Sequence, residues 1–196
     1  TFGSDSITVD DLAIDPTVSS TLYAAGFDGV LKSIDGGASW NSTNTGLTTR
    51  WIRVLTLAPT TPSSLYAGTV NGIYKSTDNG ATWMVSSRGF IDTGVASMSI
   101  DPHAAATLYA SYGGLAKSTD NGETWFALDA GGDFPTLLAV APTTPTTLYA
   151  SVLEGPFGAN DTGIMKSADG GTTWTLFTDL SPGPLAVDPT NPDVLY

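Results

Sequence analysis

Carboxylates are the side chains of this sequence with the widest scope for chemistry. Nineteen Asp and Glu residues stand against seven Lys and Arg, one His and no Cys. Two carboxylates about 5–10 Å apart can cleave a glycosidic bond, one as the acid and the other as base or nucleophile. Six residues are candidates for such a pair: Asp10, Asp11, Asp92, Asp133, Glu154 and Asp161. None lies in a recognisable catalytic context, so we expect each to be a solvated loop residue.

The remaining functional groups do not form a catalytic or metal-binding set. His103 follows Asp101-Pro102, a pattern typical of a surface turn rather than of a general base. Metal sites need clusters of Cys or His, or the regular carboxylate spacing of a calcium loop, and the sequence has neither. We therefore predict no catalytic residue, no metal and no cofactor.

A second group of aspartates recurs within a nine-residue signature. The signature reads Lys32-Ser-Ile-Asp-Gly-Gly-Ala-Ser-Trp40, Lys75-Ser-Thr-Asp-Asn-Gly-Ala-Thr-Trp83, Lys117-Ser-Thr-Asp-Asn-Gly-Glu-Thr-Trp125 and Lys166-Ser-Ala-Asp-Gly-Gly-Thr-Thr-Trp174. Its aspartates are 43, 42 and 49 residues apart. A period of about 40–45 residues is typical of a four-stranded propeller blade.

Short alternating runs predict the strands of each blade. Strand A is predicted at Leu12-Ala-Ile14, Leu55-Thr-Leu57, Met98-Ser-Ile100, Leu138-Ala-Val140 and Leu185-Ala-Val187, because these runs alternate and stop at a proline. Strand B carries a Leu-Tyr pair, strand C runs into the signature Lys-Ser, and strand D starts near the signature Trp. No window keeps a helical period. We predict an all-β chain, 1–196, forming a single β-propeller array of four-stranded antiparallel blades at about 12–43, 54–86, 97–128 and 137–177, with half of a fifth at 185–196.

The signature itself is expected to be a C–D hairpin that serves the fold. Asp-Gly-Gly and Asp-Asn-Gly accept the positive φ of tight turns, the Asp carboxylate can accept backbone N–H bonds, and the Trp supplies an apolar plug. A group repeated once per blade cannot converge on one substrate. We therefore predict a structural role for Asp35, Trp40, Asp78, Trp83, Asp120, Trp125, Asp169 and Trp174.

The motif Ser-x-Asp-x-Gly-x-x-Trp resembles the bacterial neuraminidase repeat, or Asp box, and its Asp-Pro…Leu-Tyr context resembles the bacterial variety. The resemblance covers essentially the whole chain. It implies a β-propeller of the kind found in sialidases, xyloglucanase-type glycoside hydrolases and sortilin-type receptors, but it does not imply an activity. A sialidase would need an arginine triad converging from separate blades, whereas Arg50 and Arg53 share one connection.

The half-blade at 185–196 leaves two ways to complete the array. The chain is expected to be a piece of a larger ring of six to eight blades, completed by further sequence or by a second copy. Alternatively, the half-blade pairs with a neighbouring chain, because an open strand edge invites partners. Self-association through this half-blade is therefore one predicted interaction.

The loops of a blade fall into a uniform and a variable set. In an antiparallel A–B–C–D order, the A–B and C–D loops lie at one end of the blade and the B–C and D–A loops at the other. The B–C and D–A loops differ between repeats, as binding loops on a rigid scaffold do; we call their end the variable face. It offers Phe27 and Asp28 in its first loop. The predicted ligand-binding residues are Arg50, Trp51, Arg53, Arg88, Phe90, Tyr112, Glu154, Phe157 and Asp161.

Composition narrows the partners. The formal charge is −12 and no basic run is present, which excludes nucleic acid as an expected partner. No apolar run approaches the roughly 18 residues of a membrane span. The surface is poor in Lys and rich in Thr, Ser, Gly and Asn, which favours an extracellular or cell-surface location.

Three functions are consistent with these observations. The first is a non-catalytic, secreted or cell-surface propeller module that binds carbohydrate or protein through the variable face, where aromatic and Arg side chains gather. The second is a fragment of a glycoside hydrolase whose catalytic carboxylates lie partly outside the chain. The third is a structural element that assembles through open blade edges. The sequence favours the first, a protein without catalytic activity.

Overall fold

The computed structural model is built from four antiparallel sheets of four strands each, which confirms the predicted all-β fold class. It describes residues 8–59, 64–89, 94–130, 138–143, 146–152, 163–179, 186–188 and 191–195, and these contain no helix. The chain divides into two compact units, Thr1–Val95 (unit 1) and Ala96–Tyr196 (unit 2). Whether all the sheets form one continuous array stays a prediction.

Each unit holds two sheets, and strand order within every sheet follows the chain. Unit 1 contains β1 (Val9–Ile14), β2 (Leu22–Gly26), β3 (Gly29–Ser33) and β4 (Asn41–Ser42), then β5 (Ile52–Leu57), β6 (Leu65–Thr69), β7 (Gly72–Ser76) and β8 (Met84–Val85). Unit 2 contains β9 (Ser97–Ile100), β10 (Leu108–Ser111), β11 (Leu115–Ser118) and β12 (Phe126–Leu128), then β13 (Leu138–Ala141), β14 (Thr147–Val152), β15 (Gly163–Ser167) and β16 (Thr175–Thr178).

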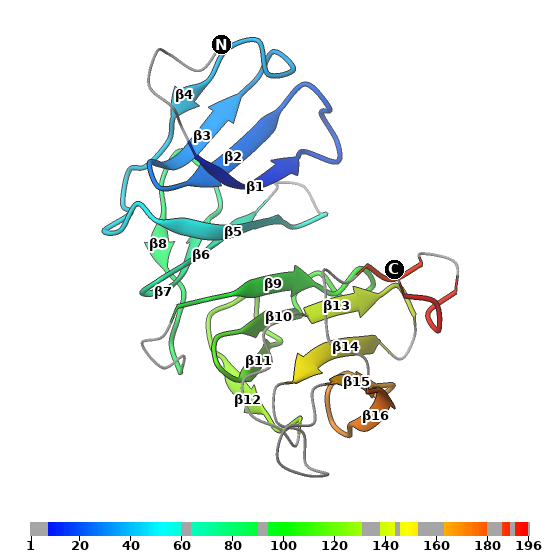
Figure 1. Cartoon of the computed structure of the whole chain (residues 1–196). Coiled ribbons are helices and arrows are strands. Elements are labelled where there is room, and N and C mark those ends of the chain that lie inside the picture. The colour runs from blue at the N-terminus through cyan, green and yellow to red at the C-terminus, as the bar shows by residue number, and fades with distance from the viewer. Residues whose placement is uncertain are drawn as a thin grey trace. The chain divides into compact units, whose positions relative to one another are not determined.

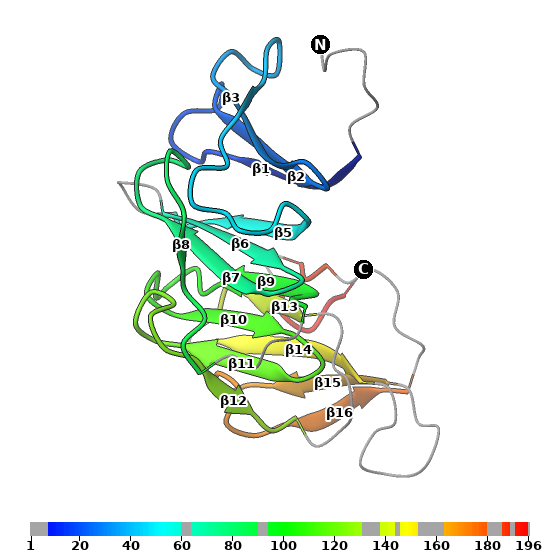
Figure 2. The ribbon, with the colours of Figure 1, turned by 90° about the vertical axis from the view of Figure 1, so that its left-hand side faces the viewer.

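Within a unit, the two sheets meet through their first strands. In unit 1, β1 lies beside β5, and in unit 2, β9 lies beside β13 (Figures 1 and 2). In a propeller, the first strands of neighbouring blades lie side by side at the inner edge, and each unit shows this arrangement. No helix that could span a membrane occurs in the described part of the chain.

The sheets of unit 1 share one hydrophobic core. Tyr23 from β2, Leu55 from β5, Leu65 from β6 and Trp83 from the second signature are at most 4% exposed and belong to one cluster. Because the period of a strand is two, β2 and β6 each turn alternate residues toward this cluster. The core therefore joins two sheets whose sequences are one repeat apart.

The signature turns are held by their own side chains. In the first turn, Ser33 Oγ donates to Asp35 (2.7 Å) and accepts the N–H of Gly37 (2.9 Å). Asp35 also accepts the backbone N–H of Ser39 (2.9 Å) and the Ser39 hydroxyl (2.5 Å). The other three turns repeat this pattern at Asp78, Asp120 and Asp169. The carboxylate thus satisfies turn N–H groups that would otherwise lack partners.

The A–B loop lies against the signature turn of its own sheet, as the meander requires. Gly36 N–H donates to Ser20 O (2.9 Å) in the first sheet, and Asn121 N–H donates to Ala106 O (2.9 Å) in the third. The B–C and D–A loops consequently belong to the opposite end of each sheet. This places the variable loops apart from the repeated turns.

A signature lysine joins the two sheets within each unit. Lys32 pairs with Tyr23 across β2 and β3, its Nζ lies 5.3 Å from the Tyr23 ring centroid, and both side chains donate to Asn79 O in the next signature turn (3.0 and 3.1 Å). In unit 2, Lys117 Nζ lies 5.4 Å from the Tyr109 ring and donates to Gly170 O (2.9 Å).

The predicted half-blade follows β16. Val187 and Leu195 form an antiparallel bridge and pack with Tyr149 of the fourth sheet. Lys166 forms an ion pair with Asp193. The half-blade therefore contacts the fourth sheet through the same Tyr and Lys positions that join the earlier sheets.

Candidate functional site

A tight turn in unit 1 presents an aromatic ring to solvent. Phe27 and Asp28 form the two-residue connection between β2 and β3, and Gly29 supplies a φ of 96°. Asn44 braces the turn, because its Oδ1 accepts Val30 N–H (2.7 Å) and its Nδ2 donates to Asp28 O (2.9 Å). A Cβ on Gly29 would lie 2.2 Å from Asn44 Oδ1, so only glycine fits. The Phe27 side chain is 52% exposed.

A β-bulge in the next sheet presents a guanidinium nearby. The ladder between β5 and β6 shifts register between Ile52 and Val54, so Arg53 is an extra residue. Bulges re-aim side chains, and Arg53 is exposed while Ile52 is fully buried. A Cβ on Gly94 would lie 3.3 Å from Arg53 Nη1, so the glycine leaves room for the guanidinium.

Phe27, Trp51 and Arg53 form one stack, which we call the aromatic platform. The Phe27 and Trp51 ring centroids are 4.6 Å apart with an interplanar angle of 19°, and Arg53 Cζ lies 4.8 Å from the Trp51 ring centroid. Stacked rings contribute about 0.5–1.5 kcal/mol beyond their burial, and an exposed cation–π contact about 0.5–1 kcal/mol. The platform is therefore ordered by its own contacts.

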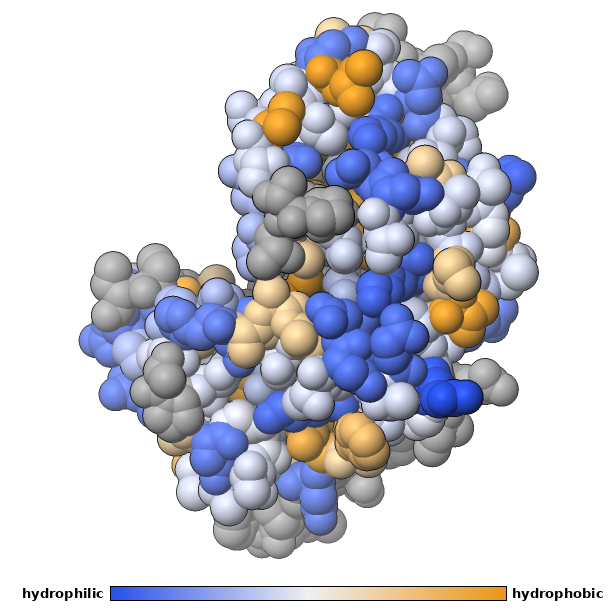
Figure 3. Space-filling view, turned by 180° about the vertical axis from the view of Figure 1, so that it is seen from behind, coloured by the Kyte–Doolittle hydropathy of each residue, from blue (hydrophilic) through white to orange (hydrophobic). Residues whose placement is uncertain are grey.

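The platform combines flat apolar area with hydrogen-bond donors. Trp51 is 36% exposed beside the more exposed Phe27, and the Arg53 guanidinium carries N–H donors in a fixed planar fork. On the face shown in Figure 3, hydrophobic residues form small separate patches on a largely hydrophilic surface. A ligand with an apolar face and hydroxyl or carbonyl oxygens at its edge matches this chemistry.

The platform is not part of the repeat. One repeat of 43 residues relates Phe27 to Val70, Thr8 to Trp51 and Asp10 to Arg53. The bulge itself recurs, because β1 also shifts register between Val9 and Asp11. Both sheets of unit 1 thus contain the bulge, whereas the side chains at the bulge differ.

The other predicted ligand residues are dispersed. Arg50 and Arg88 are both exposed, and within the described residues neither makes a ring contact with the platform. Tyr112 is half-buried in unit 2, in the turn that corresponds to the turn of Phe27. Four predicted residues lie outside the described part of the chain: Phe90, Glu154, Phe157 and Asp161.

Two candidate acids can be placed in the structure. Asp11 accepts the backbone N–H of Leu12 (2.8 Å) and of Leu55 (2.7 Å), so it links β1 to β5. Asp10 is the exposed bulge residue of β1. Asp92 and Asp133, like Glu154 and Asp161, lie outside the described residues.

The single histidine and the signature acids are engaged in turns. His103 is exposed and donates its backbone N–H to Asp101 (2.9 Å). The hydroxyl of Ser39, followed by the Ser39 N–H and the Ser33 hydroxyl, lowers the pKa of Asp35 to about 2. Thr hydroxyls do the same for the other three signature acids, each with a pKa of about 2. Among the described residues, no group of three or more His, Asp or Glu could hold a metal ion.

Sequence reasoning named the members of the platform but not their contact. Phe27 belongs to a loop of the variable face, and Trp51 and Arg53 are predicted ligand-binding residues. Their contact depends on the packing of two sheets, which residue spacing alone does not encode. All three residues differ in type from the residues at the equivalent positions of the neighbouring repeat, and this shared difference is the signal that could have indicated the contact.

Comparison with known proteins shows the fold of the chain but not its family. No protein-family model matches the chain, and no curated protein matches it. Among solved structures, a GH74 enzyme from Niastella koreensis is 25% identical with a TM-score of 0.74, over 95% of this chain and 33% of its own. The GH74 xyloglucanase from Xanthomonas campestris is 20% identical with a TM-score of 0.74, over 95% and 34%. The extracellular domain of a one-component system from B. thetaiotaomicron is 16% identical with a TM-score of 0.66, over 97% and 23%.

These similarities support a partial propeller. The chain spans from about a quarter to a third of the length of these structures. All-β sheets in a blade arrangement are shared with proteins that include carbohydrate-active enzymes and extracellular domains.

Proposed function

We propose that this chain is part of an extracellular propeller of the Asp-box type that binds carbohydrate at the aromatic platform. The observation that carries the proposal is the exposed stack of Phe27, Trp51 and Arg53, whose side chains depart from the repeat. Two similar structures support a carbohydrate ligand, since they are GH74 enzymes, and a third supports an extracellular location. A protein ligand is the competing outcome of the test below.

Each member of the platform has a distinct role. The exposed Phe27 ring receives the apolar face of a sugar, Trp51 supports Phe27 from beneath the stack, and Arg53 donates hydrogen bonds to sugar oxygens. Arg50 and Arg88 extend the basic and polar surroundings on unit 1. Phe90, Tyr112, Glu154, Phe157 and Asp161 remain proposed ligand-binding residues of other variable loops and are not assigned to the platform. The signature Asp and Trp residues are proposed to serve the scaffold.

Calorimetric titration with xyloglucan and other β-glucan oligosaccharides tests the proposal. We expect Trp51→Ala to weaken binding by about tenfold or more, because a buried or stacked aromatic anchor contributes about 1.4 kcal/mol or more. Phe126→Ala is the matched control, since Phe126 is a 64% exposed aromatic residue in unit 2. Binding of no oligosaccharide, or equal loss in both variants, would contradict the proposal.

A fragment of a glycoside hydrolase is the second candidate, because two of the similar structures are GH74 enzymes. Asp10 is the described candidate acid that lies exposed on the bulge of β1. Reducing-sugar release from β-glucans by the chain together with the sequence that completes its propeller, and its loss in Asp10→Asn, would favour this candidate over a binding module. Binding without release favours the first proposal.

A further inference from the structure

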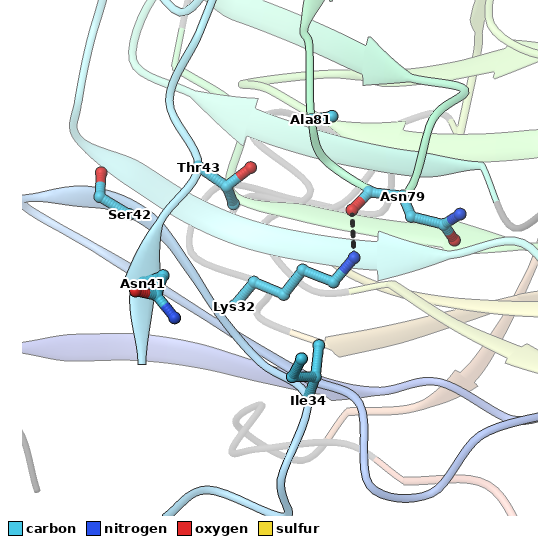
Figure 4. A pocket seen from close by; sticks show the side chains of 7 residues that line it. All are labelled: Lys32, Ile34, Asn41, Ser42, Thr43, Asn79 and Ala81. Carbon is cyan, nitrogen blue, oxygen red and sulfur yellow. Dashed lines mark hydrogen bonds between the residues drawn. The ribbon is translucent and has the colours of Figure 1, made fainter. Parts of the chain in front are cut away.

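A second candidate site lies between the two sheets of unit 1 and shares no lining residue with the platform. A pocket of about 240 Å³ is bordered by Lys32 and Ile34 of the first sheet, by Asn41, Ser42 and Thr43 at its outer strand, and by Asn79 of the second signature turn (Figure 4). Pockets for drug-sized ligands enclose about 300–1,000 Å³. This one therefore fits a smaller unit.

The walls of the pocket are fixed by hydrogen bonds between the sheets. Lys32 Nζ donates to Asn79 O (3.0 Å), as the dashed line in Figure 4 shows. Thr43 Oγ1 donates to Gly80 O, and Trp83 Nε1 donates to Thr43 O (2.8 Å). A site whose walls are already ordered loses less entropy when a ligand binds.

The residues at the outer strand depart from the repeat. Asn41 and Ser42 form β4, whereas the same strand of the second sheet, β8, consists of the exposed Met84 and Val85. The opposite change occurs at Ile34, which is 69% exposed where the second signature has Thr77. The second repeat folds without the polar pair and without the apolar residue at these positions, so the fold does not require them. Both border this pocket.

The chemistry of the lining is cationic and rich in donors. Lys32 brings an ammonium with three donors, of which Asn79 O takes one. Asn41, the partner of Lys32 across β3 and β4, brings an amide, while Ile34 provides an apolar wall; the Ser42 hydroxyl instead accepts from Asn44 Nδ2 (2.8 Å). No carboxylate borders the pocket, although the chain carries a formal charge of −12.

We propose that this pocket binds one carboxylate-bearing sugar unit, of the uronic acid class. The carboxylate pairs with Lys32, the amide of Asn41, which pairs with Lys32 across β3 and β4, binds the sugar hydroxyls, and Ile34 contacts the ring. A charged hydrogen bond is the stronger kind, so the carboxylate sets the specificity. This site does not depend on the aromatic platform.

The test uses the whole chain, ¹⁵N-labelled, titrated with glucuronate, glucose and acetate while amide shifts are recorded. We expect saturable shifts around β4 and the second signature turn with glucuronate, and weaker binding of glucose and acetate by about tenfold. Equal binding of glucose would overturn the role of the carboxylate. Equal binding of acetate would overturn the role of the sugar, and no saturable shift would overturn the site.

Two variants separate the site from the scaffold. Asn41→Met installs the residue that β8 carries at the same position, opposite the signature lysine, so the fold tolerates it, and we expect glucuronate binding to be lost. Lys32→Gln removes the charge and is expected to weaken glucuronate binding more than glucose binding. Trp51→Ala, which disables the platform, is expected to leave the glucuronate shifts unchanged. Unchanged glucuronate binding in Asn41→Met would overturn the proposal.

Discussion

Leu55 and Leu12 occupy the same position of consecutive repeats but lie in opposite environments. Leu55 on β5 is 4% exposed and belongs to the cluster that joins the two sheets of unit 1, whereas Leu12 on β1 is 53% exposed. Truncation of a buried Leu to Ala costs about 2–5 kcal/mol through lost burial and the cavity left behind. An exposed position away from special features changes stability by about 0.5 kcal/mol or less. We therefore expect Leu55→Ala, but not Leu12→Ala, to destabilise the protein.

Urea unfolding followed by tryptophan fluorescence measures this difference. With an m-value of about 2 kcal/mol/M, typical of small proteins, Leu55→Ala lowers the midpoint of the unit 1 transition by about 1–2.5 M. Leu12→Ala leaves it within about 0.3 M at low protein concentration. An equal loss in both variants would refute the inference that the sheets pack through β5 with the outer face of β1 open. A Leu12→Ala loss that appears only at high concentration would instead reveal self-association on that face, as a sedimentation experiment would show by a rise in mass.

Two further predictions concern the turns. Each signature Asp has a pKa of about 2, lowered from 3.8 chiefly by a hydroxyl hydrogen bond. The stability that these carboxylates contribute is present above pH 3.8 and is lost as the pH falls toward 2. The urea midpoint should therefore drop between pH 5 and pH 2.5, and a midpoint that does not change with pH would contradict the hydrogen-bonded turn. Gly46 has a φ of 94° and a Cβ there would lie 2.1 Å from Trp83 O, whereas Gly36 has a φ of 71° and open space around it. Gly36→Ala bears only the strain of positive φ, about 1–2 kcal/mol of folding free energy, and Gly46→Ala should destabilise the protein more than that because of the added clash. Equal melting temperatures of the two variants would contradict the close approach at Gly46.

The sequence predicted the sheets because the repeat supplies several copies of each signal. Strands that stop at a proline, such as β1 at Ile14 and β5 at Leu57, end where expected. Their beginnings were missed: β1 starts at Val9 and β5 at Ile52, ahead of the alternating runs. The cause is the bulge, since one extra residue breaks the alternation on which strand prediction depends.

The site could be predicted only as a list of residues. Trp51 and Arg53 stand out by type, but Phe27 reaches Trp51 from another sheet, and that contact requires the packing of tertiary structure. The pocket beside Asn41 gave no signal by residue type, because Asn and Ser are ordinary surface residues. It becomes visible when β4 is aligned with β8, where a polar pair replaces Met84 and Val85.

The lysine contact of residues 191–195 differs in kind from the contacts of the earlier lysines, whereas the Tyr149 hydroxyl bonds a backbone carbonyl as Tyr23 does. Lys32 and Lys117 end on backbone carbonyls of a signature turn, whereas Lys166 ends on the side chain of Asp193, whose carboxylate is 65% exposed. A solvent-accessible ion pair contributes at most about 1 kcal/mol and is screened by salt, while a bond to a neutral carbonyl depends on ionic strength less. High salt therefore weakens the contact of residues 191–195 with the fourth sheet more than the lysine contacts of the earlier sheets, and proteolysis at high salt is expected to cut this segment first.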